Sequence, residues 1–272
     1  MRSILSLLIA TVFALSACQS MGVGGSGGQA PVLSRIVKSG ELRIGMSGDQ
    51  PPLNARSKSG SLIGLEVDLA KALAEAMKVQ AKFVVKPFPD LLPALEKGDV
   101  DMVMSGVTIT PGRNMKAAFV GPYFLSGKSI LTSQKALDRL DEVPDINASS
   151  VSLAALRGST SQQFVEMLAP NAKLVLIDAY DEGVSKVIDG SVDALVADYP
   201  ACVLSVLRNP EAGLATLENP FTVEPIGIAL PPNAPLFVNL VENYLSAIEG
   251  TGILAQLTIK WLDDPSWISQ LK

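Results

Sequence analysis

The strongest structural signal in the sequence is the segment Met102-Val103-Met104-Ser105-Gly106-Val107-Thr108-Ile109-Thr110-Pro111-Gly112-Arg113. Its apolar start predicts a β-strand, and Thr110 followed by Pro111 is typical of a helix N-cap and a first helical residue. Arg113 then lies in the first helical turn, where a cation opposes the helix dipole, so local helix stability does not explain it. A fixed guanidinium after free hydroxyl groups suits the capture of a carboxylate. A solvated surface arginine is the alternative.

Composition narrows the classes of function. The chain has 272 residues, of which 48% are hydrophobic and 18% charged, so it can form one large or two medium domains with a sizeable core. The formal net charge is −5 and no basic block stands out, which argues against a nucleic-acid surface. The sequence has no histidine, which excludes His-based metal sites, Ser-His-Asp triads and imidazole acid–base chemistry.

The first residues are typical of a targeting segment. An apolar run, too short for an ordinary membrane span, ends in Leu15-Ser16-Ala17-Cys18, which looks like the lipobox of bacterial lipoproteins. An ordinary signal peptide cleaved near the same place is the alternative. We predict a lipoprotein signal peptide over 1–18 with lipidation at Cys18, followed by a glycine-rich flexible tether over 19–34. Cys202, the other cysteine, then has no intrachain partner and is predicted to be buried.

Strand and helix patterns alternate along the remaining chain, which predicts an α/β architecture. Leu65, Leu69, Leu73 and Met77 fall four residues apart and predict a helix that packs one apolar stripe on a core. Strands are expected at 42–46, 62–64, 82–85, from 102, and at 128–132, 151–156, 174–177, 192–197 and 226–230. Helices are expected at 65–77, 89–97, 138–143, 161–168, 181–188, 201–207, 236–249 and 253–261.

One pattern occurs twice. Residues 95–104 and residues 187–196 each run through a helix end, a glycine, the pair Val-Asp and an apolar strand. The pattern predicts two similar lobes, each directing the carboxyl end of a strand at a shared cleft, although αβ units also resemble one another by chance. Ligands bind at the carboxyl ends of strands in open α/β sheets and at domain interfaces.

A second candidate anion site is Gly158-Ser159-Thr160-Ser161, which precedes an expected helix. The leading N–H groups of a helix lack intrahelical partners, and the first turn here has no Asp or Glu to occupy the positive end of the dipole. A ligand carboxylate could do so. The alternative is a plain capping box, with Ser159 paired to Gln162 or Thr160 paired to Gln163.

Asp198 supplies a negative charge directly after an apolar strand. It could pair with a ligand ammonium or merely cap the helix after Pro200. Together with Arg113 and the amides near Thr160, it matches the two charges of a zwitterionic α-amino acid. Phe88 could supply an apolar wall or belong to the core.

From about residue 42 to residue 262, the chain resembles the family 3 extracellular solute-binding proteins of ABC importers, the polar amino acid group. The resemblance is carried, in order, by Ser47-Gly48-Asp49-Gln50-Pro51-Pro52-Leu53, Gly64-Leu65-Glu66-Val67-Asp68-Leu69-Ala70, Leu92-Pro93-Ala94-Leu95, Gly98-Asp99-Val100-Asp101, Ser105-Gly106-Val107-Thr108-Ile109-Thr110-Pro111-Gly112-Arg113, Gly158-Ser159-Thr160-Ser161 and Val192-Asp193-Ala194-Leu195-Val196-Ala197-Asp198.

The resemblance implies a two-lobed periplasmic-binding-protein-like fold of type II. Each lobe would be a mixed sheet flanked by helices, with lobe 1 formed by 35–127 and 225–272, lobe 2 formed by 128–224, and two segments crossing between them. The lobes would hinge shut on an amino acid or similar small carboxylate and deliver it to an ABC permease. We expect a monomer without a cofactor, held by its lipid on the periplasmic or extracellular face of the cell envelope.

The resemblance also implies roles for individual residues. The ligand carboxylate would be held by Arg113, Ser159, Thr160 and Ser161. The ligand ammonium would be held by Asp198, Gly106 and Thr108. The ligand side chain would meet Gln50, Leu53, Phe88 and Ser105. Many members carry an aromatic residue at the place of Gln50 and Phe at that of Leu53, so the side-chain preference stays open.

Two other functions compete with solute binding. The same fold hosts an enzyme branch resembling cyclohexadienyl (prephenate/arogenate) dehydratase, and Gly48-Asp49 and Gly127-Lys128-Ser129 would fit that branch. Its reaction needs an acid near the departing hydroxyl, but the branch's glutamate aligns near Pro200-Ala201, which are not acidic. We therefore predict no catalytic residue and no enzymatic activity. The other competitor is a lipid-anchored sensor or scaffold with a degenerate site, because fold does not fix function.

Overall fold

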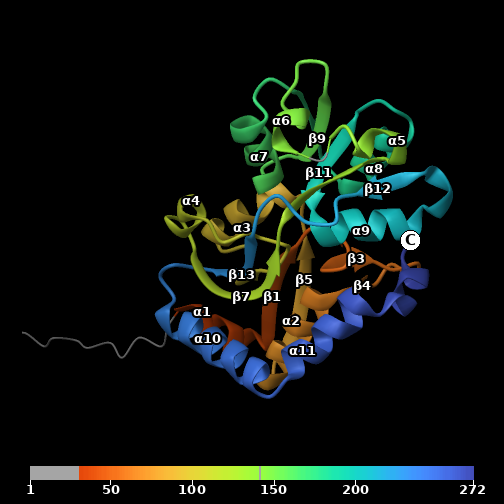
Figure 1. The fold of residues 1–272 in the computed structure, drawn as a ribbon. Helices are drawn as coiled ribbons and strands as arrows, with labels where there is room; N and C mark the ends of the chain where they lie inside the picture. Colours follow the sequence, from red (N-terminus) through yellow and green to blue (C-terminus); the bar gives the residue numbers. More distant parts are fainter. Residues whose placement is uncertain (1–30, 141) are drawn as a thin grey trace, which may run out of the picture.

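The computed structural model describes residues 31–140 and 142–272, which form two lobes (Figure 1). The predicted signal peptide over 1–18, the lipidation site Cys18 and the tether as far as residue 30 lie outside the described residues. Helix α1, Pro31–Ser39, begins inside the predicted tether, so residues 31–34 are helical. Among the described helices, none has the length and apolar character needed to cross a membrane.

The first lobe contains a five-stranded mixed sheet in the order β5-β1-β6-β13-β7. The strand β1, Glu41–Met46, runs parallel to β5, Gln80–Val85, and to the central strand β6, Met102–Val103. The strand β13, Glu224–Leu230, is antiparallel to both β6 and β7, Ala118–Ser126. A short three-stranded sheet of β2, Asp49–Gln50, β3, Asn54–Arg56, and β4, Leu62–Ile63, lies beside it. The sequence did not predict β7, because Gly121-Pro122 interrupts its apolar run and weakens the strand signal.

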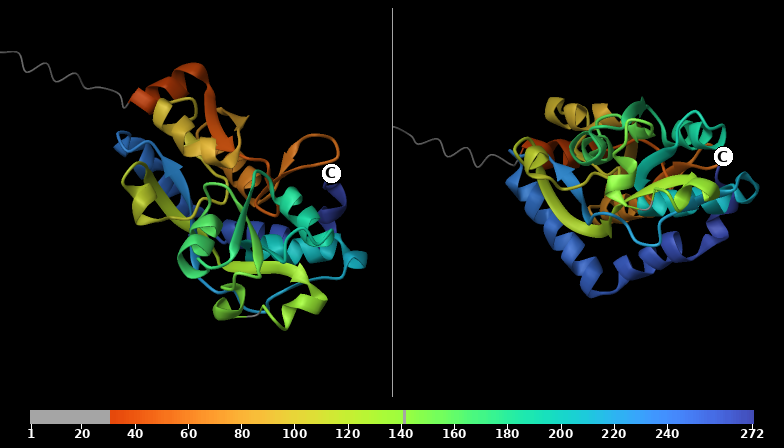
Figure 2. Two further views of the ribbon diagram at one scale, coloured as in Figure 1. Left: turned by 90° about the horizontal axis from the view of Figure 1, so that it is seen from above. Right: turned by 45° about the horizontal axis from the view of Figure 1, so that its top comes forward.

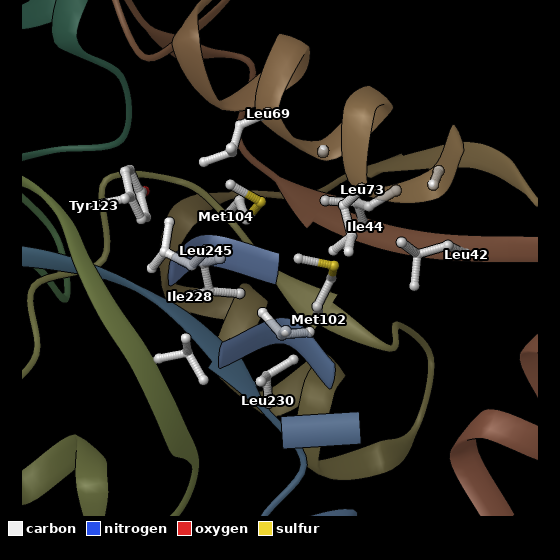
Figure 3. Packing of buried hydrophobic residues seen from close by; sticks show 14 of the residues in the cluster. Leu42, Ile44, Leu69, Leu73, Met102, Met104, Tyr123, Ile228, Leu230 and Leu245 are labelled. Carbon is white, nitrogen blue, oxygen red and sulfur yellow. The ribbon is translucent and has the colours of Figure 1, made fainter. Parts of the chain in front are cut away.

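Helices from the N-terminal and the C-terminal parts of the chain cover one face of this sheet. They are α1, α2 (Leu65–Ala76), α10 (Pro235–Gly250) and α11 (Ile253–Thr258). Figure 3 shows Leu42 and Ile44 of β1 meeting Leu69 and Leu73 of α2 and Leu245 of α10. The predicted apolar stripe of α2 is therefore core packing, as expected. The helices α10 and α11 form the lower outer edge of the molecule in Figure 1 and in the right panel of Figure 2.

The second lobe has a sheet of the same kind, in the order β10-β9-β11-β8-β12. Its parallel strands are β9, Ser152–Leu156, β10, Lys173–Ile177, and β11, Ala194–Asp198, while β8, Lys128–Ser133, is antiparallel to β11 and to β12, Leu214–Thr216. The helices of this lobe are α5 (Gln134–Leu137), α6 (Val143–Ile146), α7 (Thr160–Leu168), α8 (Tyr180–Ile188) and α9 (Tyr199–Arg208). Both lobes are thus mixed sheets flanked by helices, as predicted.

Three further places differ from the sequence prediction. The helix expected at 138–143 is wrong, because α5 and α6 lie on either side of that segment. The strand β12 was not predicted. The helix expected at 253–261 ends at Thr258, and a π-helical turn over Ile259–Asp263 and a 3-10 helix over Pro265–Gln270 follow. There Trp261 and Trp267 pack on each other with ring centroids 5.1 Å apart.

The repeated Val-Asp pattern has the same structural role in both lobes. Asp101 accepts a hydrogen bond from the backbone N–H of Arg43 in β1 at 2.7 Å, and Asp193 accepts one from the backbone N–H of Ser152 in β9 at 2.7 Å. Each aspartate therefore holds the start of the neighbouring parallel strand. The preceding glycines, Gly98 and Gly190, both have a positive φ near 75°, which favours glycine at a helix end. The two lobes are structural repeats.

Two segments cross between the lobes and lie side by side. The first is Gly127, which links β7 to β8, and the second runs over 217–223 from β12 to β13. The Phe221 N–H donates to Lys128 O at 2.7 Å, and the Lys128 N–H donates to Thr222 Oγ1 at 2.9 Å. Glu224, which was assigned to the second lobe, already pairs with Ser126 in the sheet of the first.

Candidate functional site

The lobes meet around a small cavity at the carboxyl end of β11. The cavity has a volume of about 10 Å³, which is about the space that one water molecule needs. It is lined by Gln50, Pro51, Pro52, Leu53, Ser126, Tyr180, Asp198, Pro200 and Ala201. Beside it, Thr108 Oγ1 of the first lobe lies 3.2 Å from Thr160 Oγ1 of the second. Residues from both lobes therefore surround the predicted cleft.

Arg113 is held at this interface. Thr110 caps the short helix α4, Pro111–Asn114, by accepting a hydrogen bond from the Arg113 N–H at 3.2 Å, as the sequence predicted. The guanidinium donates to Thr108 O at 2.9 Å and, across the lobes, to Gly158 O at 3.3 Å. Its central carbon lies 5.8 Å from the centre of the Phe88 ring.

The surroundings of Arg113 also perturb its charge. Burial lowers the pKa of Arg113, and the negative charges of Glu224 and Asp198 partly oppose this effect. A free surface arginine would show neither burial nor contacts with two lobes. Arg113 is half-buried, and its guanidinium is oriented by two backbone carbonyls and one aromatic ring.

The N-terminus of α7 is capped. Ser159 Oγ accepts hydrogen bonds from the Ser161 N–H at 3.1 Å and the Gln162 N–H at 3.2 Å, and Gln162 Oε1 accepts from the Gly158 N–H at 2.8 Å. The cap engages the amides of Ser161 and Gln162 but not that of Thr160, the first residue of the helix. Ser159 therefore caps the helix as expected, but Gln162 bonds Gly158 and not Ser159, so the reciprocal capping box is not formed. The cap leaves the amide of Thr160 at the positive end of the helix dipole.

Asp198 has a partner that the sequence analysis missed. Asp198 occupies the N-cap position of α9, but its side chain makes no capping hydrogen bond. Instead, Lys128 Nζ lies 2.5 Å from Asp198 Oδ1 and 3.8 Å from Glu224 Oε2. Lys128 is 1% exposed. A charged residue directly before the apolar run Ser129-Ile130-Leu131 is the sequence signal that could have identified it.

The backbone of Gly106 is held by a hydrogen bond to a buried acid. The fully buried Glu66 accepts hydrogen bonds from the Gly106 N–H at 2.7 Å, from Asn54 Nδ2 at 2.5 Å and from the Tyr123 hydroxyl. Burial raises the pKa of Glu66, and these three donors oppose that shift. Gly106 has a φ of 59°, and an added Cβ would collide with Gln50 Oε1. Glu66, an acid on the buried face of α2, was another functional position that the sequence analysis missed.

The residues predicted to form the side-chain pocket do not all line the cavity. Gln50 and Leu53 line the cavity, and Phe88 lies against Arg113 at its edge. Ser105 does not line the cavity, because its hydroxyl accepts from the Ser47 N–H at 2.9 Å and donates to Ser47 Oγ at 3.0 Å. Ser105 therefore holds the loop that leads to β2.

Several buried polar atoms at the cleft have no hydrogen-bond partner. Over residues 31–140 and 142–272, such side-chain atoms are Arg35 Nε, Asp49 Oδ1, Ser126 Oγ and Ser161 Oγ, and the last three belong to the region of the cleft. Ser126 lines the cavity, and Ser161 and Asp49 both lie near Tyr180. Unsatisfied buried groups are rare in native proteins and are common at binding sites.

Tyr180 lies at the centre of this polar cluster. Burial, followed by the charges of Asp198 and Asp49, raises its pKa well above the usual range. Burial also raises the pKa of Asp49, and the nearby Asp181 adds to the shift while a hydrogen bond from Ser47 opposes it. In the described part of the chain, no group of three or more Cys, Asp or Glu side chains is arranged to hold a metal ion.

Comparisons with known proteins agree with this architecture. The model of the bacterial extracellular solute-binding proteins, family 3, matches residues 42–264. A solved structure of an ancestral amino acid-binding protein, a precursor of cyclohexadienyl dehydratase, is 34% identical with a TM-score of 0.79 and covers 85% of this chain and 99% of its own. The resemblance seen in the sequence and the predicted fold class are thereby confirmed.

Two curated relatives represent the two functions of this fold. The ABC transporter arginine-binding protein 1 of Escherichia coli (strain K12) is 25% identical over 224 residues, which are 81% of this chain and 90% of that protein. The cyclohexadienyl dehydratase of Pseudomonas aeruginosa is 27% identical over 231 residues, which are 85% of this chain and 86% of that protein.

Proposed function

The chain belongs to the bacterial extracellular solute-binding proteins, family 3, and from this premise we propose that it captures a small carboxylate of the amino acid class between its lobes. The observation that carries the proposal is the position of Arg113, whose guanidinium contacts carbonyls of both lobes at 2.9 and 3.3 Å. A ligand carboxylate at this point would stabilise the state in which the lobes touch. Delivery to an ABC permease would follow closure.

The carboxylate would be bound by Arg113 together with Ser159, Thr160 and Ser161 at the start of α7. The guanidinium would exchange its bond to Gly158 O for bidentate contacts with the ligand. The amide of Thr160 and the buried hydroxyl of Ser161, which lies beside Tyr180, would complete the anion site.

The rest of the ligand would lie toward the small cavity. The group on the α-carbon would face Asp198, Gly106 and Thr108, and Gln50, Leu53 and Phe88 would meet the ligand side chain. Tyr180 and Ser126, which share the cavity with Gln50 and Leu53, belong to the same wall. Opening of the lobes at the two crossing segments would enlarge the cavity to admit the ligand.

The cellular setting is part of the proposal. Lipidation of Cys18 would attach the protein to the membrane, and the glycine-rich segment that follows would let both lobes reach the permease. A single lipid-anchored molecule holds a complete cleft, so we propose a monomer. The two closing bodies would be 35–127 with 224–272, and 128–223, since Glu224 pairs in the sheet of the first lobe.

The test is thermal melting of the chain from residue 19, which lacks only the predicted signal peptide and lipidation site. The panel contains the twenty amino acids and their deaminated carboxylate analogues. A ligand of the folded state raises the melting temperature by mass action. A rise with one compound that disappears in Arg113→Ala supports the proposal, and no rise with any carboxylate contradicts it.

A dehydratase activity is the second candidate, and Asp49 favours it. This carboxyl group lies at the cleft, its Oδ1 has no partner, and burial raises its pKa, which suits an acid that donates a proton. The neighbouring Pro200 and Ala201 supply no acid. Conversion of prephenate to phenylpyruvate that is lost in Asp49→Asn would establish the activity, and absence of conversion would leave solute binding as the function.

A further inference from the structure

Lys128 places a positive charge at the acid that was predicted to bind the ligand ammonium. Its Nζ lies 2.5 Å from Asp198 Oδ1, and the lysine is 1% exposed. A lysine this deeply buried is uncommon unless its charge is paired. The pair is therefore part of the built site and not a solvated surface contact.

The fold fixes this pair. Lys128 and Asp198 stand opposite each other in the antiparallel ladder of β8 and β11. Side chains of directly opposed residues lie on the same face of a sheet and interact. The backbone of Lys128 is also bonded to the second crossing segment, through Thr222 Oγ1 and the Phe221 N–H. The backbone positions of Lys128 and Asp198 are therefore fixed relative to each other by the sheet.

The second acid of the cluster is also engaged. Glu224 Oε2 lies 3.8 Å from Lys128 Nζ, and Glu224 Oε1 accepts a hydrogen bond from Thr222 Oγ1 at 3.1 Å. Glu224 further interacts with the charge of Arg113. Asp198 Oδ1 is thus bonded to a buried lysine, and a ligand ammonium at Asp198 would lie close to this second positive charge in a desolvated site.

We propose that the cognate ligand is a small carboxylic acid whose α-carbon carries an oxygen in place of an ammonium group, a 2-oxo or 2-hydroxy acid. This inference rests on the proposed function, because Arg113 and α7 still hold the carboxylate. The Lys128 ammonium stands where the ammonium of an amino acid would face Asp198. An ammonium has three donors, and Asp198 and Glu224 use at most two of them. The third is available to the 2-oxygen of the ligand.

The test compares compounds that differ only at the α-carbon. Four matched sets are titrated calorimetrically at pH 7 into the chain from residue 19: alanine, pyruvate and lactate; leucine, 4-methyl-2-oxopentanoate and 2-hydroxy-4-methylpentanoate; glutamate, 2-oxoglutarate and 2-hydroxyglutarate; phenylalanine, phenylpyruvate and phenyllactate. We expect at least one oxo or hydroxy acid to bind at least tenfold more tightly than its amino acid.

The variant Lys128→Gln keeps a polar side chain but frees the charge of Asp198 for a ligand. It should shift the preference at least tenfold toward the amino acid of the same set. Lys135→Gln, which changes an exposed lysine of α5 in the same lobe, is the matched control and should leave the ratio unchanged. Circular dichroism confirms that each variant is folded.

The outcomes separate the two proposals. Tighter binding of the amino acid by the unsubstituted protein overturns the inference and leaves the proposed function intact, whether or not Lys128→Gln folds. An unchanged ratio in a folded Lys128→Gln also overturns it. Binding of only an amino acid outside these sets also overturns the inference and keeps the proposed function. If no compound of these sets or of the thermal-melting panel binds, or if Arg113→Ala binds the carboxylates as well as the unsubstituted protein, the proposed function itself is wrong.

Discussion

Thr108 Oγ1 and Thr160 Oγ1, 52 positions apart in the sequence, lie 3.2 Å from each other across the two lobes. Thr160 was predicted to hold the ligand carboxylate and Thr108 the ligand ammonium, so the contact joins the two halves of the predicted site. Thr108 ends the central segment of the first lobe and Thr160 starts α7 of the second. The contact brings the guanidinium of Arg113 and the N-terminus of α7 into one place, although neither lobe contains both. Binding at this place therefore reports directly on lobe closure.

Arg113→Ala should abolish tight binding with little effect on folding. The variant removes a charged partner of the ligand carboxylate, and we expect a loss of at least about 2 kcal/mol in binding free energy, about thirtyfold in affinity. Titration calorimetry with the ligand found by thermal melting measures it. The exposed Lys116→Ala, three residues away, is the control and should bind normally. Equal affinity of both variants would exclude Arg113 from the site.

Gly127→Ala should destabilise the protein at the crossing segments. An added Cβ would collide with Thr222 O and lie 2.6 Å from Pro220 Cβ, so the two segments would have to separate. Overpacking of this kind costs about 1–3 kcal/mol. Chemical unfolding measures the change. Gly112→Ala is the matched control, because no atom lies within 4 Å of its added Cβ. A Gly127→Ala variant as stable as Gly112→Ala would contradict the described packing.

Asp101 and Asp193 should differ in their contribution to stability although they occupy equivalent places. Asp101 is buried and accepts hydrogen bonds from both the backbone N–H and the guanidinium of Arg43. Asp101→Ala should therefore lower the free energy of unfolding by about 3 kcal/mol or more. Asp193 is exposed and binds Ser152, so Asp193→Ala should cost about 1 kcal/mol. Urea denaturation of the two variants provides the comparison. The reverse order would show that burial does not set the difference.

Asp49→Asn should stabilise the protein, and its gain in unfolding free energy over the unsubstituted chain should grow as the pH rises. The pKa of Asp49 is raised by burial, so the folded state holds its proton more tightly than the unfolded state does. This preference stabilises the protein below the ordinary aspartate pKa and is lost as pH rises through the raised value. The asparagine has no charge to bury. The gap in urea midpoint between Asp49→Asn and the unsubstituted chain should therefore widen from pH 4 to pH 8 in favour of the variant.

The direction in which the urea-midpoint gap changes with pH decides whether burial or stabilisation of the Asp49 carboxylate dominates. A gap that narrows with rising pH would mean that the Asp49 carboxylate is stabilised in the folded protein, and its proposed role as a proton donor would be wrong. The variant Asp181→Asn, at the start of α8, supplies a related control. Its negative charge contributes to the shift of Asp49, so its removal should reduce the pH dependence without abolishing it.

The local parts of the fold were predictable from the sequence. The spacing of Leu65, Leu69 and Leu73 fixed the buried face of α2, and the Thr110-Pro111 pair fixed the start of α4. The Val-Asp repeat identified two similar lobes, because the same short-range chemistry recurs at Asp101 and Asp193. These signals depend on neighbours within a few residues, which a sequence displays directly.

The pairings across sheets were not predictable. Lys128 meets Asp198 over 70 positions only because β8 and β11 are antiparallel in one register. Glu66 meets Tyr123 over 57 positions for a comparable reason, through the packing of α2 under the central sheet. Ser105 was expected in the cleft, but the loop at Ser47 uses its hydroxyl. No local pattern distinguishes these outcomes.

The position of Lys128 links ligand choice to mobility. Its side chain occupies the binding cluster, while its N–H and C=O bind Thr222 and Phe221 of the other crossing segment. A force on the ammonium group is therefore transmitted to both strands about which the lobes must turn. A substitution of the side chain would keep these two backbone hydrogen bonds and change only the charge that Asp198 meets. Under our proposal, ligand choice and the connection between the two crossing segments would thus depend on different parts of one residue.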